Sequence, residues 1–175
     1  MFSVGDTVIY GSMGVCSITD ICVPDMPGAS RECYVLVPQY VPNSKVYAPV
    51  ENNPVVIRYL LTADQAESLI DSLPGITMFP VTGEKQAMYE TYRGAIKSTD
   101  CVSLARLIKT LHQRKQHTLE QKRVVPSAEK EFFDTAERML YGEIAAAMRM
   151  PLEAVPDYIA GRLEPGDTTL RMVVS

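Results

Sequence analysis

The stretch VGDTVIYGSMGVCSI, residues 4–18, decides how the first part of the chain folds. An extended apolar segment begins at Val8, breaks at a glycine-rich run over residues 11–14 and resumes at Val15. Glycine adopts the backbone conformations that tight turns need, so this run predicts a corner between two strands. A corner of this kind is typical of a small β-barrel, whose interior we expect to hold Val4, Val8 and Val15. Small barrels bind proteins, RNA or DNA.

Short candidate strands, separated by turn residues, continue from this corner to about residue 60. They are rich in Val, Ile, Tyr and Cys, and Gly, Pro, Asn and Asp lie between them. A segment of short strands buries its edges only by curling into a partly closed barrel. The predicted strands cover residues 8–10, 15–21, 33–37 and 45–49.

After residue 60 the apolar residues recur with a helical period. Thr62 and Gln65 form a candidate capping box at the start of the first helix, which ends at Pro74. The predicted order then is a helix over 84–97, a helix capped by Asp100, a loop over 116–126, a long helix over 127–148 and a short helix from about residue 151.

The change of pattern predicts an α+β chain in two parts. We expect a Tudor/SH3-like small β-barrel over residues 1–60 and an all-helical domain of about five helices over residues 61–163. Residues 164–175 form a tail that the pattern assigns to neither domain.

The charge of the chain is small but unevenly distributed. A formal net charge of −4 argues against a strongly basic nucleic-acid-binding protein. Residues 101–125, however, carry six basic side chains and one acidic side chain, and the rest of the chain is acidic. This basic stretch is either a solvated helix face with a lysine-rich loop or a surface that faces phosphates.

Several classes of function lack their motifs in this sequence. It contains no pattern of a nucleotide-binding loop, a serine hydrolase or a zinc protease, so we expect no catalytic residues. The four cysteines form no CxxC pair and the two histidines complete no ligand spacing, which favours reduced thiols with no metal and no cofactor. We see no signal peptide and no long apolar span, which favours a cytoplasmic protein with no membrane contact.

Both parts of the chain contain residues that resemble one bacterial family. Phe2, the run VGDTVIY over residues 4–10, Gly14–Val15 and Ile18 resemble the start of the CarD/CdnL family of bacterial transcription regulators. The stretch VYAPVENN, residues 46–53, resembles its strand-and-turn segment, and Arg58 falls where the family often has an arginine. EKEFFDTAERMLYGEIAAA, residues 129–147, resembles the long helix of the family.

The resemblance implies a function for each part. The barrel would be similar to the polymerase-interacting domain of the transcription-repair coupling factor, which docks on the β subunit of RNA polymerase partly by pairing a sheet edge. The helical domain would contact upstream promoter DNA at its backbone and minor groove and modulate the stability of the open complex. The family also implies a monomer that is not an enzyme. The expected polymerase-binding residues are Val46, Tyr47, Ala48, Pro49 and Val50, and the expected DNA-binding residues are Lys85, Arg93, Lys97, Arg114, Lys115, Lys122 and Arg123.

The sequence departs from the family pattern at two of these contacts. Many members place a tryptophan near Glu84 as a wedge in the minor groove, but this chain contains no tryptophan and has Lys85 or a neighbour there. A lysine cannot unstack a base step. Phe79 can replace the tryptophan only if its loop places the ring at the start of the helix near Glu84. On the barrel, Tyr47 stands about where some members carry an arginine.

Three functions therefore stay open. The first is a polymerase-binding regulator that contacts DNA. The second is a polymerase-binding adaptor whose helical domain binds protein, which the missing tryptophan and the acidic balance favour. The third is a KOW-like RNA-binding module, although the first 63 residues hold only three basic side chains. A continuous positive face that joins residues 85–97 with residues 114–123 favours DNA, and two separate patches favour the adaptor.

Overall fold

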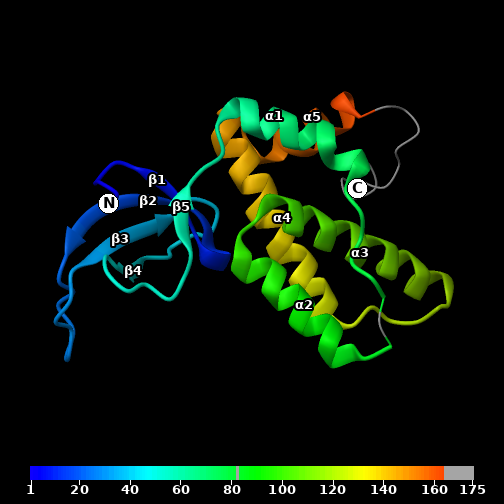
Figure 1. Ribbon diagram of the computed structural model, residues 1–175, viewed down its shortest axis with the longest axis horizontal. Helices are drawn as coiled ribbons and strands as arrows, with labels where there is room; N and C mark the ends of the chain where they lie inside the picture. Colours follow the sequence, from blue (N-terminus) through cyan, green and yellow to red (C-terminus); the bar gives the residue numbers. More distant parts are fainter. Residues whose placement is uncertain (82, 164–175) are drawn as a thin grey trace.

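The computed structural model describes residues 1–81 and 83–163, and within these residues an antiparallel sheet precedes five α-helices. The sheet region (residues 1–60) lies at the left of Figure 1 and the helical region (residues 61–163) lies at the right. The predicted α+β fold class is confirmed. The predicted tail, residues 164–175, lies outside the described residues.

The sheet has the strand order β4–β3–β2–β1–β5, so β4 and β5 are its edges. The predicted corner is a 3-10 turn over Gly11–Met13, where Gly11 and Gly14 have positive φ angles of 46° and 71°. The last strand, Ile57–Tyr59, was not predicted, because it has only three residues and is defined by its pairing with β1. The strands are β1 (Thr7–Tyr10), β2 (Gly14–Cys22), β3 (Cys33–Pro38), β4 (Val46–Pro49) and β5 (Ile57–Tyr59).

The helices follow the predicted order, with one boundary corrected. The capping box is confirmed, since Thr62 and Gln65 exchange hydrogen bonds between side chain and backbone at the start of α1. Asp100 caps α3 as expected. The loop predicted from residue 116 is wrong at its start, because good helix formers carry α3 on to Glu120 without an apolar stripe. The helices are α1 (Ala63–Ser72), α2 (Lys85–Ser98), α3 (Cys101–Glu120), α4 (Ser127–Met148) and α5 (Val155–Arg162).

Each region has its own apolar core. Val8 lies in the core of the sheet region and Val15 is buried, but Val4 is exposed and that expectation is wrong. Val4 lies in the turn over Val4–Gly5, which Asp6 N–H closes by donating to the Ser3 carbonyl at 3.0 Å, so the strand alternation that directs side chains inward begins only after it. The main residues of the sheet core are Val8, Tyr10, Cys16, Ile18, Tyr34, Leu36 and Ala48.

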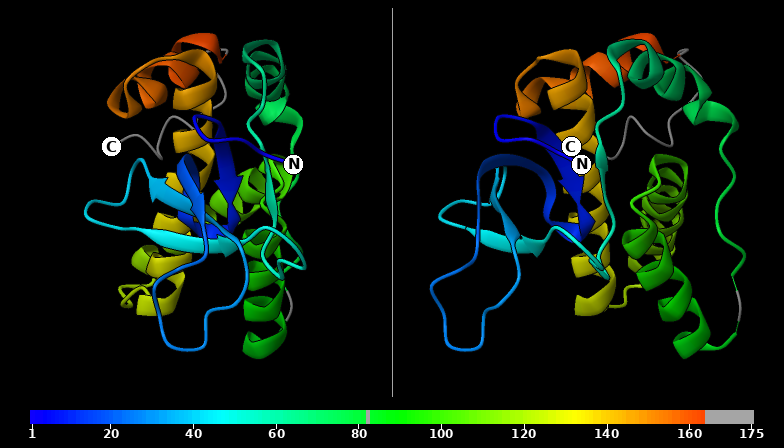
Figure 2. Two further views of the ribbon diagram at one scale, coloured as in Figure 1. Left: turned by 90° about the vertical axis from the view of Figure 1, so that its left-hand side faces the viewer. Right: turned by 60° about the vertical axis from the view of Figure 1, so that its left-hand side comes forward.

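The long helix α4 stands between the sheet and helices α2 and α3 (Figure 2). A Cβ atom added at Gly142 would lie 2.9 Å from the Tyr40 ring, so only glycine admits this ring against the helix. One turn earlier, Arg138 donates to the Ser12 carbonyl at 3.2 Å. The two regions are therefore packed against each other through one face of α4.

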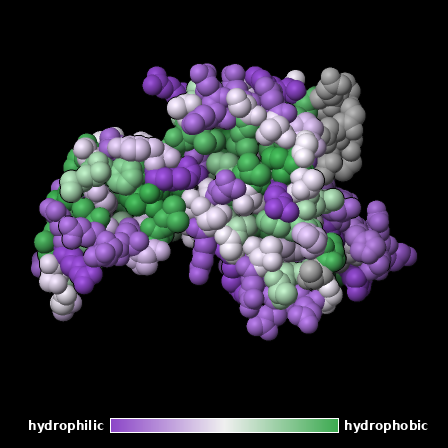
Figure 3. Space-filling view, viewed as in Figure 1, coloured by the Kyte–Doolittle hydropathy of each residue, from purple (hydrophilic) through white to green (hydrophobic). Residues whose placement is uncertain are grey.

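A groove lies where the chain passes from β5 into α1. It is lined by Tyr59, Leu60, Leu61, Leu69 and Val102, and Figure 3 shows apolar surface gathered in the middle of this face. Within residues 1–81 and 83–163, no helix has the length and apolar character to cross a membrane.

Candidate functional site

The strand β4 offers a free edge at the outer end of the sheet. Val50 N–H donates to the Glu32 carbonyl at 3.0 Å, just beyond the paired residues of β3 and β4. Backbone bonds alternate along an antiparallel strand, so residues 46, 48 and 50 bond towards β3 and residues 47 and 49 point outward. Pro49 has no N–H group. The outward groups of β4 are therefore the N–H and carbonyl of Tyr47 and the carbonyl of Pro49.

The five predicted polymerase-binding residues divide between the two faces of the sheet. Ala48 is buried in the core, and Val46 and Val50 pack partly against it. Ala48 therefore presents no side-chain surface to a partner, and Val46 and Val50 present only part of theirs. Pro49 is partly buried on the other face. Tyr47 is exposed on the other face, opposite Val35, with the Lys45 Nζ atom 5.6 Å from its ring centroid. Tyr47 thus combines an outward backbone with an accessible aromatic ring.

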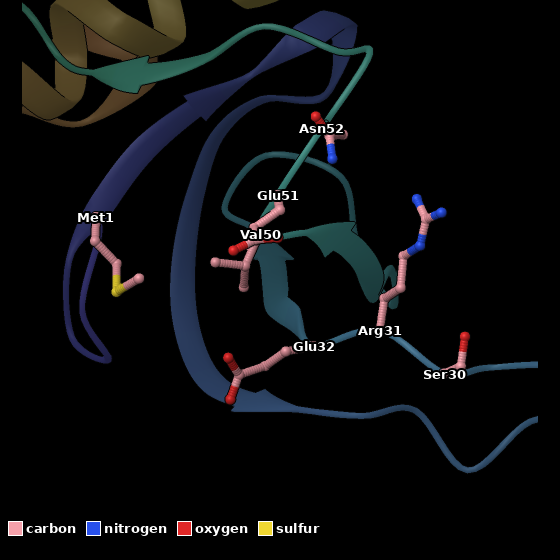
Figure 4. Close-up of a pocket in the computed structure, with 7 residues that line it drawn as sticks. All are labelled: Met1, Ser30, Arg31, Glu32, Val50, Glu51 and Asn52. Atoms are coloured by element: carbon pink, nitrogen blue, oxygen red, sulfur yellow. The ribbon is translucent and has the colours of Figure 1, made fainter.

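A pocket adjoins the end of this edge strand (Figure 4). Val50, Glu51 and Asn52 line one side of it, and Ser30, Arg31 and Glu32 from the segment before β3 line another. Figure 4 shows the Arg31 and Asn52 side chains on one side of the pocket and the Glu32 side chain pointing away from them. The pocket holds charges of both signs, so it suits a polar protein segment better than a phosphate backbone.

Three of the predicted DNA-binding residues come together in the helical region. Lys85, Arg114 and Arg123 line one pocket between the start of α2, the second half of α3 and the start of α4. Lys115 and Lys122 are exposed near the same end of α3, and Lys122 adopts a positive φ of 54° in the turn after it. This end of the helical region therefore collects most of the predicted cations.

Arg114 differs from the other cations because its charge is already paired. Its Nη2 atom lies 2.7 Å from Oε1 of Glu129, and its Nε atom donates to Oε2 at 3.3 Å. Glu129 is buried, and the hydrogen bond with it is the main reason that the pKa of Arg114 is raised. Arg114 thus contributes less net charge to the pocket than Lys85 or Arg123.

The remaining two cations lie further along α2. The Arg93 guanidinium lies 6.0 Å from the Phe132 ring centroid, and Lys97 is in the last turn of the helix. Twelve residues of helix place Lys97 about 18 Å from Lys85. Glu131 lies beside Arg93 in the groove between α2 and α4. Lys85, at the start of α2, therefore shares one basic surface with Arg114 and Arg123. Further along α2, Glu131 separates Arg93 and Lys97 from that surface.

Apolar side chains beside the basic pocket escaped the sequence prediction. Val124 is 91% exposed and lines the pocket, and Val81 is 70% exposed in a neighbouring pocket that shares Arg114 and Arg123. Isolated valines in polar loops were the available signal for them. Phe79, by contrast, is held on α3, where the Arg106 guanidinium lies 4.3 Å from its ring centroid.

An ion pair between the two regions also went unpredicted, although both residues were part of the family pattern. Glu143 is only 1% exposed and accepts from Arg58 at 2.6 and 2.7 Å, from Leu61 N–H at 2.9 Å and from the Cys101 thiol at 3.1 Å. Arg58 also donates to the Thr99 carbonyl at 2.7 Å. The hydrogen bond with Glu143 is the main reason that the pKa of Arg58 is raised.

Comparison with known protein families identifies both parts of the chain. Residues 2–60 match the CarD-like/TRCF RID domain, and residues 81–160 match the CarD C-terminal domain. A comparison with curated proteins found no match. The two domains occur in the order that the sequence motifs predicted, and together they span most of the chain. The CarD family consists of non-enzymatic transcription factors. The chain therefore belongs to the CarD/CdnL family of RNA polymerase-interacting transcription regulators.

Proposed function

We propose that this protein binds the β subunit of RNA polymerase through the free edge of β4 and contacts upstream promoter DNA through its helical region. Bound in this way it modulates the stability of the open promoter complex. The observation that carries the proposal is the position of Tyr47. Its backbone points away from the sheet on an edge strand and its ring is exposed on the adjacent face.

An edge strand is a physically sound site for a protein partner. A partner strand satisfies the outward backbone groups, and its alternate side chains provide selectivity. Tyrosine serves well beside such an edge, because its rigid ring buries apolar area at little entropic cost. The mixed charges of the pocket in Figure 4 extend the surface beyond the end of β4.

The DNA contact in this proposal is weak by itself. Lys85 and Arg123 lie at one pocket, and each phosphate that a cation neutralises contributes one salt-dependent term to the affinity. A few such contacts give only nonspecific binding. The docked β4 edge compensates for this weakness, because tethering raises the effective concentration of the helical region at the DNA.

A second candidate is an adaptor whose helical region binds a protein. The pairing of Arg114 with Glu129 favours it, since it reduces the positive charge of the pocket. The exposed Val81 and Val124 beside that pocket are also suited to a protein surface. The two candidates share the polymerase contact and differ in the partner of the helical region.

The polymerase contact is tested with the full chain and the purified β subunit. The variant Tyr47→Pro removes the outward N–H group of β4, and we expect it to weaken binding at least about tenfold, equivalent to roughly 1.4 kcal/mol. The matched control is Tyr59→Ala on the opposite edge strand, which also removes an exposed tyrosine. Binding of Tyr47→Pro at wild-type strength, with an unchanged circular dichroism spectrum, contradicts the proposal.

A further inference from the structure

Two of the four cysteines lie directly opposite each other on neighbouring strands. Cys22 is the last residue of β2 and Cys33 is the first residue of β3, and the two are partners in the antiparallel register. Cys22 is partly exposed, whereas Cys33 is buried. The chain between them, residues 23–32, forms the connection from β2 to β3.

The register places the two thiols within reach of a covalent bond. Opposite residues of an antiparallel pair have Cα atoms about 4.5 to 5.5 Å apart, and disulfides span about 4.4 to 6.8 Å between Cα atoms. Their side chains project from the same face of the sheet. Glu32, Tyr34 and Leu36 bond towards β4, so Cys33 bonds towards β2 and forms a hydrogen-bonded pair with Cys22, in which the Cα and Cβ atoms are each about 5.5 Å apart. A disulfide needs about 3.5 to 4.5 Å between Cβ atoms, so closure requires the strand ends to shift by roughly 1 to 2 Å.

The other two cysteines lack these properties. Cys16 lies in the core of the sheet region, where burial raises the pKa of its thiol to about 12. Cys101 is buried and donates to Glu143, and burial is the main cause of its raised pKa. A thiol reacts as its thiolate, so both are poor nucleophiles. Selective chemistry follows from the partial exposure of Cys22 and from the position of Cys33 directly opposite it.

We propose that Cys22 and Cys33 form a dithiol site that low-molecular-weight disulfides oxidise to a cross-strand disulfide. The Cys22 thiolate attacks one sulfur of the reagent and releases one small thiolate, which leaves a mixed disulfide on Cys22. The Cys33 thiolate then attacks the Cys22 sulfur and releases the second small thiolate. The released thiolates take up the two protons of the protein thiols. Two electrons pass from the protein sulfurs to the reagent disulfide.

The bond would form beside the proposed polymerase contact. Cys33 is opposite Pro49 of β4, and Arg31 and Glu32, just before Cys33, line the pocket in Figure 4. Oxidation therefore acts on the end of the β4 edge, and this consequence alone rests on the proposed function. Formation of the disulfide depends only on the sheet.

The site is tested on the full chain without polymerase. The protein is incubated with oxidised glutathione, its free thiols are alkylated, and tryptic peptides are analysed by mass spectrometry. Cys22 falls in peptide 1–31 and Cys33 in peptide 32–45. We expect wild-type protein to lose two free thiols and to yield these two peptides joined by a disulfide that dithiothreitol reverses.

Two variants assign the roles of the sulfurs. Cys33→Ser should retain a glutathione adduct on Cys22, because no second thiol releases it. Cys22→Ser should lose the link between the peptides, although Cys16 remains in peptide 1–31. A wild-type protein that keeps glutathione on Cys22 without forming the link overturns the proposal. A link that persists in Cys22→Ser overturns it as well, because Cys16 would then be the partner.

Discussion

The two ends of α4 hold the same kind of ion pair in different surroundings. Near the start of the helix, buried Glu129 binds Arg114 of α3 at 2.7 Å. Near its end, buried Glu143 binds Arg58 of β5 at 2.6 Å. In both pairs the glutamate is almost fully enclosed and the arginine is partly exposed. The chemistry of the two pairs is equivalent, so their different surroundings explain their different roles.

Both members of the pair at the end of α4 make further contacts within the fold. Glu143 also binds the Leu61 backbone and the Cys101 thiol, and Arg58 also binds the Thr99 carbonyl. The pair thus joins β5, the turn between α2 and α3, and α4. At the start of α4, Arg114 faces an open pocket with Lys85 and Arg123. The additional contacts of each ion pair, and not its residue types, therefore decide whether it holds the fold together or borders an open surface.

Removing Arg58 should have the largest effect. Arg58→Met leaves the Glu143 carboxylate buried without its cation, and we expect the free energy of unfolding to fall by about 3 to 5 kcal/mol. Urea denaturation of the full chain measures this loss. Arg114→Met is the matched control, and we expect a smaller loss because Glu129 lies beside the pocket and gains water there. Equal losses for the two variants would remove the distinction between the two ends.

The next effect concerns the packing of the sheet region on the same end of α4. In Gly142→Ala the new methyl group meets the Tyr40 ring at 2.9 Å, and overpacking of this kind costs about 1 to 3 kcal/mol. Thermal unfolding detects the change. Gly94→Ala in α2 is the control, because its Cβ would meet no atom within 4 Å, and we expect it to stabilise the protein slightly. If Gly142→Ala were as stable as wild type, Tyr40 would not pack tightly on α4.

The opposite end of α4 is tested by the salt dependence of DNA binding. We expect Lys85→Ala and Arg123→Ala each to reduce the slope of log affinity against log salt by about 0.9, because each loses one phosphate contact. Arg114→Met should change the slope less, since Glu129 already pairs with that charge. Fluorescence anisotropy with promoter DNA, in the presence of polymerase, measures the slopes. Unchanged slopes in all three variants would favour the protein-binding adaptor.

The smallest effect is a dependence of stability on pH at α3, two residues before Arg114. Burial is the main cause of the lowered pKa of His112, which is 6.5 in its unperturbed state, and the nearby Lys115 charge adds to it. Below pH 6.5, His112 binds a proton in the unfolded chain but stays neutral in the folded protein. The free energy of unfolding therefore falls as the pH falls towards the folded pKa. His112→Gln should flatten this slope in urea denaturation between pH 7 and 5. A slope that persists unchanged in His112→Gln would assign the pH dependence to another group.

The candidate polymerase contact was only partly predictable. The resemblance pointed to residues 46–50 as a group and marked Tyr47 as a departure from the family pattern, but the sequence does not say which face of the strand is buried. The register with β3 separates Tyr47 from Ala48, because it directs Ala48 into the core and Tyr47 to the exposed face. The position of β4 at an edge depends on the order of all five strands, and that order is a long-range property.

Local rules, by contrast, are readable from the chain itself. The glycine corner at residues 11–14, the capping box at Thr62 and the bounds of α4 depend on neighbouring residues, so the sequence by itself determined them. Only the tertiary structure decided which distant residues meet. Arg58 and Glu143 are 85 positions apart, and Cys22 faces Cys33 only because a register shift between Ile18 and Asp20 aligns the strand ends. Such contacts follow from packing, where long-range burial overrides any local preference.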